Sequence, residues 1–209
     1  MTVVAVTQRV DSFPDRDETR DSLDQRMTMF LLAAGQTPVT VPNCLHNAMP
    51  DGRRDYRALD AWFRSVSPAA VLLSGGNDIG EHVERDATEG WLLDHAERNG
   101  LPVLGICRGM QMLGHWAGAK LSPIQGHVRT RHRLSGVITG EVNSYHDYAL
   151  AECPDGFEVL ACSDDGTIEA IRHSAMGWEG WMWHPERELP FSAHDLARTR
   201  ALFEAAPRR

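Results

Sequence analysis

A cysteine flanked by glycines is the residue of this sequence best suited to covalent chemistry. Cys107 lies at the centre of Gly-Ile-Cys-Arg-Gly, residues 105–109, directly after a short apolar run. Small residues around a nucleophile permit a sharp turn from strand to helix that exposes its side chain. The helix N-terminus and a nearby imidazolium would favour the thiolate, and the N–H of Arg108 could donate to an oxyanion. The alternative is a buried structural cysteine.

A histidine and a carboxylate follow the most apolar segment near the end of the chain. Residues 183–186 read Trp-His-Pro-Glu, so His184 and Glu186 would lie together at the end of a strand. An activated thiol needs a base and a group that orients this base, and the pair supplies both. In the alternative interpretation, His184 packs against Trp183 in a surface loop.

Two further segments could contact a polar substrate. Residues 74–78, Ser-Gly-Gly-Asn-Asp, follow an apolar run and form a tight turn in which Gly76 could bring its N–H close to a substrate oxygen. In an open α/β sheet, ligands gather at the carboxyl ends of the strands, where this turn and Cys107 would both lie. Gln111 follows Cys107 by four residues, so a helix would place both side chains on one face.

The first two thirds of the chain alternate short apolar runs with helical patterns, which predicts a parallel sheet with crossover helices. Gly35 and Gly100 mark helix ends, and Asp86 with Glu89 has the form of a capping box. The predicted strands are Val3–Thr7, Pro38–Val41, Ala70–Leu73 and Pro102–Ile106, and the predicted helices are 21–34, 57–63, 87–99 and a helix beginning at Cys107.

After Ser122 the pattern changes to short strands separated by turns. Arg129–Arg133 is predicted as a charged loop. A closing helix is predicted over Ala193–Ala205, with Ser192 and Asp195 as its capping pair. The predicted strands of this part are Val137–Ile138, Phe157–Cys162, Ile168–Ile171 and Trp178–Trp183.

Composition narrows the class of protein. A chain of 209 residues suits one α/β domain, and its net charge of −8 argues against a nucleic-acid partner. No apolar run approaches the roughly 20 residues that span a bilayer, and the apolar start at Val3–Val6 is too short for a signal peptide. The 4 cysteines lack C-x-x-C spacing and are expected to be reduced. We therefore expect a cytoplasmic protein with no membrane role.

Taken together, these motifs resemble the class I glutamine amidotransferase superfamily, and more closely its γ-glutamyl hydrolase branch, the peptidase C26-like proteins. The resemblance rests on four segments that occur in the family's order: Leu73–Asp78, Gly105–Gln111, Val142–His146 and Trp183–Glu186. It implies a single domain over residues 1–209, with a flavodoxin-like, three-layer α/β fold whose mostly parallel central sheet is flanked by helices.

The resemblance also implies roles for particular residues. Cys107 would be the nucleophile of a γ-glutamyl amide hydrolase, His184 its base and acid, and Glu186 the residue that orients His184. It implies no metal and no organic cofactor, and a small-molecule γ-glutamyl substrate. The N–H groups of Gly76 and Arg108 would form the oxyanion hole. The α-amino and α-carboxylate groups of the glutamyl substrate would be held by Gln111 and the loop Ser144, Tyr145 and His146.

Two positions distinguish branches of this family. Amidotransferases that serve a synthase usually carry leucine after the nucleophile and proline after the paired glycines, whereas this chain has Arg108 and Asn77. This difference favours a free-standing hydrolase. A glutaminase subunit that supplies ammonia to a separate synthase stays as the alternative, and a non-catalytic sensor of glutamyl compounds is disfavoured because the cysteine, histidine and glutamate are all present.

A narrower resemblance concerns the leaving group. The segments 7–9, 20–25 and 182–187 are similar to hydrolases that release glutamate from γ-glutamyl-CDP-amidate, a nucleotide-linked phosphoramidate. Arg9 and Arg131, the latter in the expected charged loop, could then meet the phosphates; in the alternative, both are solvated surface residues. Amides of 4-aminobutyrate or a polyamine are the next substrates to consider. The sequence leaves the leaving group and the oligomeric state open, a homo-oligomer included.

Overall fold

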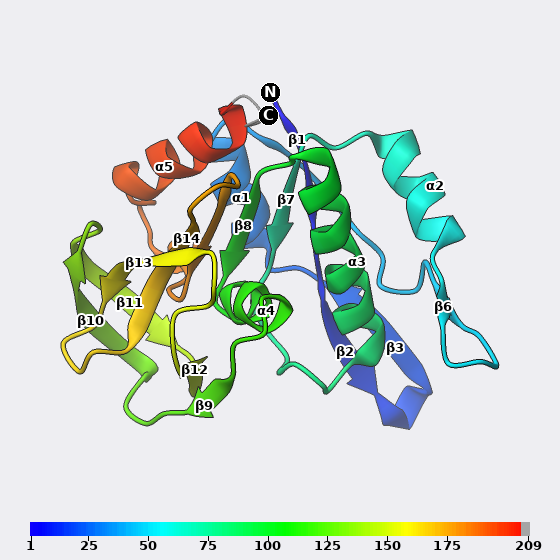
Figure 1. Cartoon of the computed structure of the whole chain (residues 1–209), viewed down its shortest axis with the longest axis horizontal. Helices are drawn as coiled ribbons and strands as arrows, with labels where there is room; N and C mark the ends of the chain where they lie inside the picture. Colours follow the sequence, from blue (N-terminus) through cyan, green and yellow to red (C-terminus); the bar gives the residue numbers. More distant parts are fainter. Residues whose placement is uncertain (206–209) are drawn as a thin grey trace.

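The fold is built on one nine-stranded sheet with helices on both of its faces (Figure 1). The computed structural model describes residues 1–205. In spatial order the strands are β11, β10, β13, β14, β15, β8, β7, β1 and β4. The last β-strand of the chain, β15, thus lies in the interior of the sheet, between β14 and β8.

Five neighbouring strands of this sheet are parallel. The three strands β1, β7 and β8 are short, buried apolar runs, which is typical of strands covered by helices on both faces. Val4 pairs with Ala70 of the neighbouring strand, and Val71 pairs with Val103 of the next. The prediction of a mostly parallel α/β sheet flanked by helices is confirmed. The parallel strands are β4 (Thr37–Thr40), β1 (Val3–Val6), β7 (Ala70–Leu73), β8 (Val103–Ile106) and β15 (Trp178–Trp181).

Helices cover the two faces of these strands and enclose two apolar clusters. Val4 and Val6 point to a face covered by α1 (Gln25–Ala33) and α5 (Ala193–Glu204). Ala5, between them, points to the opposite face, as the alternation of side chains along a strand requires. That second face is covered by α2 (Arg57–Val66), α3 (Val83–Asn99) and α4 (Arg108–Trp116). Among residues 1–205, no helix combines the length and apolar character that crossing a membrane requires.

Four antiparallel strands extend the sheet beyond β15, seen on the left of Figure 1. The expected charged loop at Arg129–Arg133 is wrong, because these residues lie in β10. Alternate residues of β10 are more buried, so its arginines share the exposed face of a strand, a period of two that is typical of a half-buried strand. The strands are β14 (Ile168–His173), β13 (Phe157–Cys162), β10 (Val128–Gly136) and β11 (Gly140–Tyr145).

Other local predictions were also wrong. The expected strand at Val137–Ile138 is instead the connection between β10 and β11. The helix α3 begins at Val83, four residues before its predicted start, because Asp86 and Glu89 do not cap it but pair with Arg108. The closing capping pair is confirmed, since the Ser192 side chain accepts from the N–H of Asp195.

Short elements surround the ends of the parallel strands. The hairpin β2–β3 was not predicted, because its polar sequence lacks the apolar alternation that signals a strand. The short elements are β2 (Arg9–Phe13), the 3₁₀ turns Pro14–Arg16 and Pro185–Arg187, β3 (Glu18–Ser22), β5 (Asn47–Ala48), β6 (Arg54–Asp55), β9 (Leu121–Pro123) and β12 (Tyr148–Leu150).

We expect Gly109→Ala to destabilise the protein, because a Cβ there would lie 2.1 Å from the Leu73 carbonyl oxygen. Relieving that overlap requires a shift of β7 or α4, and overpacking of this kind costs roughly 1–3 kcal/mol or more. Gly90→Ala is the matched control, since a Cβ at this helical position meets nothing within 4 Å. It should stabilise the protein by up to about 1 kcal/mol. Urea denaturation measures both, and equal unfolding midpoints would contradict the tight contact.

Candidate active site

Cys107 occupies a strained turn between β8 and α4. Its backbone has φ 52° and ψ −107°, a conformation that costs a non-glycine residue energy and that clusters at functional sites. The turn closes only because its flanking residues lack side chains: a Cβ on Gly105 would lie 2.5 Å from the carbonyl carbon of Gly109. The Cys107 side chain is 6% exposed, at the carboxyl end of the parallel strands.

His184 and Glu186 follow β15, the strand that pairs with β8. The His184 Nδ1 and the Glu186 Oε1 lie 2.7 Å apart, and both side chains are buried. Asn143 of β11 fixes the backbone here, because its Oδ1 accepts from the His184 N–H at 2.9 Å and its Nδ2 donates to the His184 carbonyl at 2.8 Å. Glu186 therefore fixes the imidazole ring, and Asn143 fixes the main chain that carries it.

The charges of Cys107 and His184 support each other. Burial would raise the pKa of the Cys107 thiol, but the His184 imidazolium, aided by His146 and the Arg108 N–H, lowers it overall. Burial would likewise lower the pKa of His184, yet the facing Cys107 thiolate and the Glu186 carboxylate raise it to about 9. The geometry therefore favours a thiolate–imidazolium pair at neutral pH, which is the reactive form of a cysteine nucleophile.

The glycine-rich turn after β7 lies against this pair. A Cβ on Gly75 would lie 2.8 Å from the His184 Cε1 and 3.6 Å from the Cys107 Cβ, so a larger residue would displace the imidazole. Gly76 has φ +85°, a backbone conformation that a side chain would strain. The N–H of Arg108 is among the groups that lower the pKa of the Cys107 thiol. The two predicted oxyanion residues thus lie on the two turns that border Cys107.

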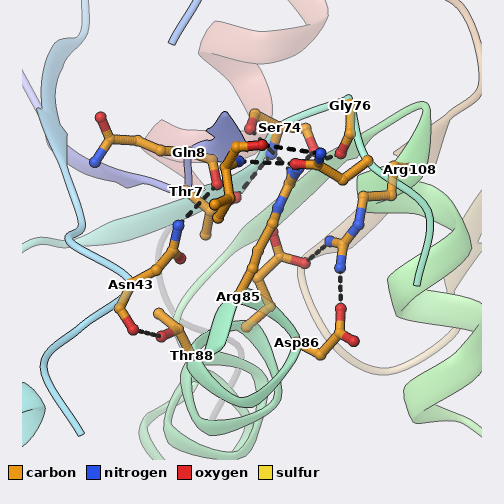
Figure 2. Close-up of polar contacts among 12 residues, drawn as sticks. Thr7, Gln8, Asn43, Ser74, Gly76, Arg85, Asp86, Thr88 and Arg108 are labelled. Carbon is orange, nitrogen blue, oxygen red and sulfur yellow. Dashed lines mark hydrogen bonds and ion pairs between the residues drawn. The ribbon is translucent and has the colours of Figure 1, made fainter. Parts of the chain in front are cut away.

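A buried ion network holds both turns. The Arg85 guanidinium donates to the carbonyl oxygens of Ser74, Gly75 and Gly76, and to Glu89 at 3.0 Å. Arg108 donates from its own side chain to Glu89 and to Asp86 of α3. Figure 2 shows Arg108 reaching Asp86, with Arg85 running alongside the turn at Ser74 and Gly76. The helix α3 therefore positions the predicted oxyanion groups through charge-assisted hydrogen bonds.

A cavity of about 450 Å³ opens beside His184. Its lining carries charges of both signs, from the arginines Arg9 and Arg187 and from the carboxylates Asp11, Asp24 and Glu186. Arg9 lies close to the glycine turn, since its Nη1 would be 3.5 Å from a Cβ on Gly76. Arg131 does not line this cavity. It lies on β10 and pairs with Glu141 and Glu188, so its expected place in a charged loop at the mouth of the site is wrong.

A second cavity, of about 610 Å³, is lined by Gln111. The Gln111 Nε2 donates to the Tyr148 carbonyl at 3.0 Å, which directs the amide toward this cavity. Asp78 and Lys120 lie in the same lining. A carboxylate, an amide and an ammonium group together could bind the charged ends of an amino acid.

The three residues of the predicted substrate loop, 144–146, have different neighbours and differ in burial. The Tyr145 ring packs edge-on against the His184 ring, with centroids 5.7 Å apart, and lies under the Arg187 guanidinium. Ser144 is fully buried and donates to the His127 carbonyl at 2.6 Å. His146 is also buried, beside Glu169. Only Tyr145 therefore offers an exposed side chain to a ligand, and contacts from the other two would come from their backbone.

Arg85 and Asn143 support the site but were not singled out from the sequence. Arg85 lies within a helix of mixed charge, where its pattern looks like a solvated face, although its side chain is fully buried. Asn143 lies within the segment Val142–His146 that contributes to the family resemblance, but the sequence did not indicate a role for it.

Comparisons with known proteins indicate the family to which the chain is similar. The family model "Glutamine amidotransferase class-I" matches residues 53–201. The γ-glutamyl-CDP-amidate hydrolase of Campylobacter jejuni is 34% identical over 125 residues, which cover 57% of this chain and 62% of that protein. Anthranilate synthase component 2 of Archaeoglobus fulgidus is 35% identical over 106 residues, 46% of this chain and 58% of that protein. The matches thus span less than two thirds of each relative.

Solved structures share the fold at low sequence identity. One is a Thermoplasma acidophilum protein described as a component of GMP synthase, which superimposes with a TM-score of 0.71 and 18% identity. The superposition covers 97% of this chain and 92% of that one. At this identity the likeness establishes the fold alone.

The lowered pKa of Cys107 predicts that its alkylation by iodoacetamide continues as the pH falls from 9 toward 7. The reason is that alkylation follows the thiolate, and a lowered pKa keeps the thiolate present at lower pH. His184→Ala removes the strongest influence that lowers the pKa of the thiol and leaves burial, which raises it, opposed only by His146 and the Arg108 N–H. Labelling should therefore slow several-fold at pH 7 and recover at higher pH. Mass spectrometry of the Cys107 peptide measures both profiles. Superimposable profiles would contradict the thiolate–imidazolium pair.

Proposed function

The chain belongs to the class I glutamine amidotransferase family, and we propose that within it this protein is a free-standing hydrolase of γ-glutamyl amides. The observation that carries the proposal is the buried arrangement of Cys107, His184 and Glu186 at one end of the parallel strands. A thiolate, an imidazolium and an orienting carboxylate are the groups that acyl transfer through a thioester requires.

In the first half of the proposed reaction, the Cys107 sulfur forms a bond to the γ-carbonyl carbon, and the carbonyl π electrons move to its oxygen. The N–H groups of Gly76 and Arg108 would stabilise this oxyanion. The tetrahedral species then collapses: the C–N bond breaks and the His184 imidazolium gives its proton to the leaving nitrogen. The products are an amine and a glutamyl thioester on Cys107.

In the second half, neutral His184 removes a proton from water, whose oxygen attacks the thioester carbon. The C–S bond breaks, glutamate leaves, and the Cys107 thiolate faces an imidazolium again. Glu186 keeps the His184 Nδ1 proton in place through both halves, so the Nε2 carries the transferred proton.

The two cavities suggest how a substrate would be divided. The cavity with Gln111, Asp78 and Lys120 suits the zwitterionic glutamyl end. The cavity beside His184 would take the leaving group. Arg9, next to Gly76, pairs with Asp11 at 2.7 Å and could exchange that partner for a phosphorylated leaving group. We therefore propose γ-glutamyl-CDP-amidate as the first substrate to test, in line with the similarity to the Campylobacter jejuni hydrolase.

A second candidate function is that of a glutaminase subunit that delivers ammonia to a synthase. It is favoured by the 35% identity to an anthranilate synthase component 2. Its reaction uses the same residues, with ammonia as the leaving group. A free-standing hydrolase should turn over its substrate rapidly without a partner, whereas an ammonia-supplying subunit should need its synthase for rapid turnover.

We expect Cys107→Ala to abolish glutamate release from γ-glutamyl-CDP-amidate, because the covalent step is lost, while thermal unfolding stays close to that of the parent. In the parent enzyme, rapid acid quenching should trap a glutamyl adduct on the Cys107 peptide, visible by mass spectrometry. Steady-state hydrolysis by Cys107→Ala would show that Cys107 is not the nucleophile. Release of glutamate only from glutamine, and only slowly, would favour the ammonia-supplying subunit.

We expect Arg9→Ala to lower kcat/KM for γ-glutamyl-CDP-amidate about tenfold, because a half-exposed arginine on a phosphate contributes near the low end of 1.5–3 kcal/mol. Hydrolysis of glutamine should stay nearly unchanged, and the effect on the nucleotide should weaken as salt rises. Arg131→Ala is the matched control, since Arg131 pairs with Glu141 and Glu188 outside the cavity lining.

A different pattern would reassign these arginines. Equal losses on both substrates would mean that Arg9 supports the turn or the glutamyl end. If Arg131→Ala lowered kcat/KM for γ-glutamyl-CDP-amidate and Arg9→Ala did not, the phosphates would be assigned to Arg131 on β10. Faster turnover of γ-glutamyl-4-aminobutyrate or a γ-glutamyl polyamine than of the nucleotide would replace the proposed leaving group.

A further inference from the structure

Three histidines and a glutamate converge in the antiparallel part of the molecule. Their ligand atoms all lie within 4.8 Å of one another. His127 precedes β10, His132 lies on β10, His146 follows β11, and Glu169 lies on β14. From these four residues we infer a divalent transition-metal site, with zinc as its best-fitting occupant.

The first argument is that the cluster leaves buried polar atoms without partners. Among the described residues, no hydrogen-bond partner is found for the His127 Nδ1, the His132 Nε2, the His146 Nε2 or either oxygen of Glu169. Glu169 is fully buried, and His127 and His146 are nearly so. A buried carboxylate without a compensating charge is strongly disfavoured, and a metal ion would satisfy all five atoms at once.

The second argument is the orientation of the imidazoles. The His127 Nε2 lies 2.8 Å from the Asp165 Oδ2, and the His146 Nδ1 lies 3.0 Å from the Tyr148 carbonyl oxygen. An acceptor at the outer nitrogen places the proton there, so the inner nitrogen presents a lone pair to the cluster. This arrangement of carboxylate or carbonyl, histidine and metal is the usual one for histidine ligands.

The third argument is distance. The Glu169 Oε1 lies 3.4 Å from the His127 Nδ1 and 3.5 Å from the His146 Nε2. A charge-assisted hydrogen bond is shorter, about 2.7–2.9 Å. Ligands bound tetrahedrally to zinc at about 2.0–2.1 Å are separated from one another by about 3.4 Å. These two separations therefore match the ligand shell of a metal better than a proton shared between the groups.

The set of donors selects the metal. Three imidazole nitrogens and one carboxylate oxygen suit zinc, cobalt or nickel rather than calcium or magnesium, which prefer oxygen ligands. Four protein ligands would close the coordination shell, as in structural zinc sites. Such a site would connect β10, β14 and the end of β11, and it does not depend on the proposed hydrolysis.

The test measures metal content rather than turnover. The full chain, without a histidine tag, is expressed in zinc-supplemented medium, and its metals are determined by elemental analysis. We expect about one zinc per chain, and the chelated protein should take up Co²⁺ with the visible absorption of a tetrahedral site and no sulfur charge-transfer band. The absence of both zinc and Co²⁺ binding in this protein would overturn the inference.

Variants locate the bound metal. Glu169→Gln should remove stoichiometric zinc. Asp165→Asn keeps every proposed ligand but changes the group that accepts from His127 and from Ser163 and Thr167, and it should weaken binding roughly 10–100-fold. Glu158→Gln, on the exposed surface of β13, is the matched control and should retain zinc. Cys107→Ser should retain it as well. Zinc lost from Cys107→Ser but kept by Glu169→Gln would place the metal at the cysteine and overturn the inference.

The variant measurements stay informative if one protein folds poorly. Circular dichroism reports whether Glu169→Gln is folded. If it is not folded, the question is decided by three proteins that keep every proposed ligand: the parent, Cys107→Ser and Asp165→Asn. Their zinc content and their Co²⁺ spectra are then compared. A parent protein whose thermal unfolding rises on adding Zn²⁺ after chelation would support the site, and an unchanged unfolding temperature without uptake would refute it.

Discussion

Glu89 is the residue on which the geometry of the candidate site depends. Its carboxylate has no exposed surface and lies between the guanidinium groups of Arg85 and Arg108. Burial would raise its pKa, but the two arginines outweigh this effect and lower it. Through Arg85 it fixes the Ser74–Gly76 turn, and through Arg108 the start of α4. Removing one member would leave a buried charge unpaired, at a cost of about 3–5 kcal/mol, so both turns share one electrostatic anchor.

Three glycines without side chains allow the main-chain segments around the candidate site to approach one another closely. Gly109 lies against the Leu73 carbonyl, Gly105 against the turn at Cys107, and Gly75 against His184. Side chains at these positions would separate β7, β8 and the end of β15. The reactive groups are therefore positioned by close backbone packing and then held by ion pairs, with the thiol and imidazole stabilising each other's charge.

The parallel half of the fold could be predicted from the sequence, because apolar runs and glycine or capping signals mark its elements directly. The convergence of Cys107, His184 and Glu186 followed from motifs at the ends of such strands. The antiparallel half was harder to predict. In Arg129–Arg133, charged residues alternate with moderately buried ones, and the segment was interpreted as a loop. Arg85, Asn143 and the cluster around Glu169 were missed because each depends on contacts between residues far apart in the sequence.

The place of β15 in the sheet has a consequence for how the protein is made. Cys107 and its turn belong to the middle of the chain, but the strand beside them and His184 come more than 70 residues later in synthesis. Until β15 inserts between β8 and β14, the thiol lacks the imidazolium that lowers its pKa. A ribosome-bound chain would thus carry an ordinary, weakly nucleophilic cysteine. The order of the strands in the sequence delays reactivity until nearly all of the fold can form.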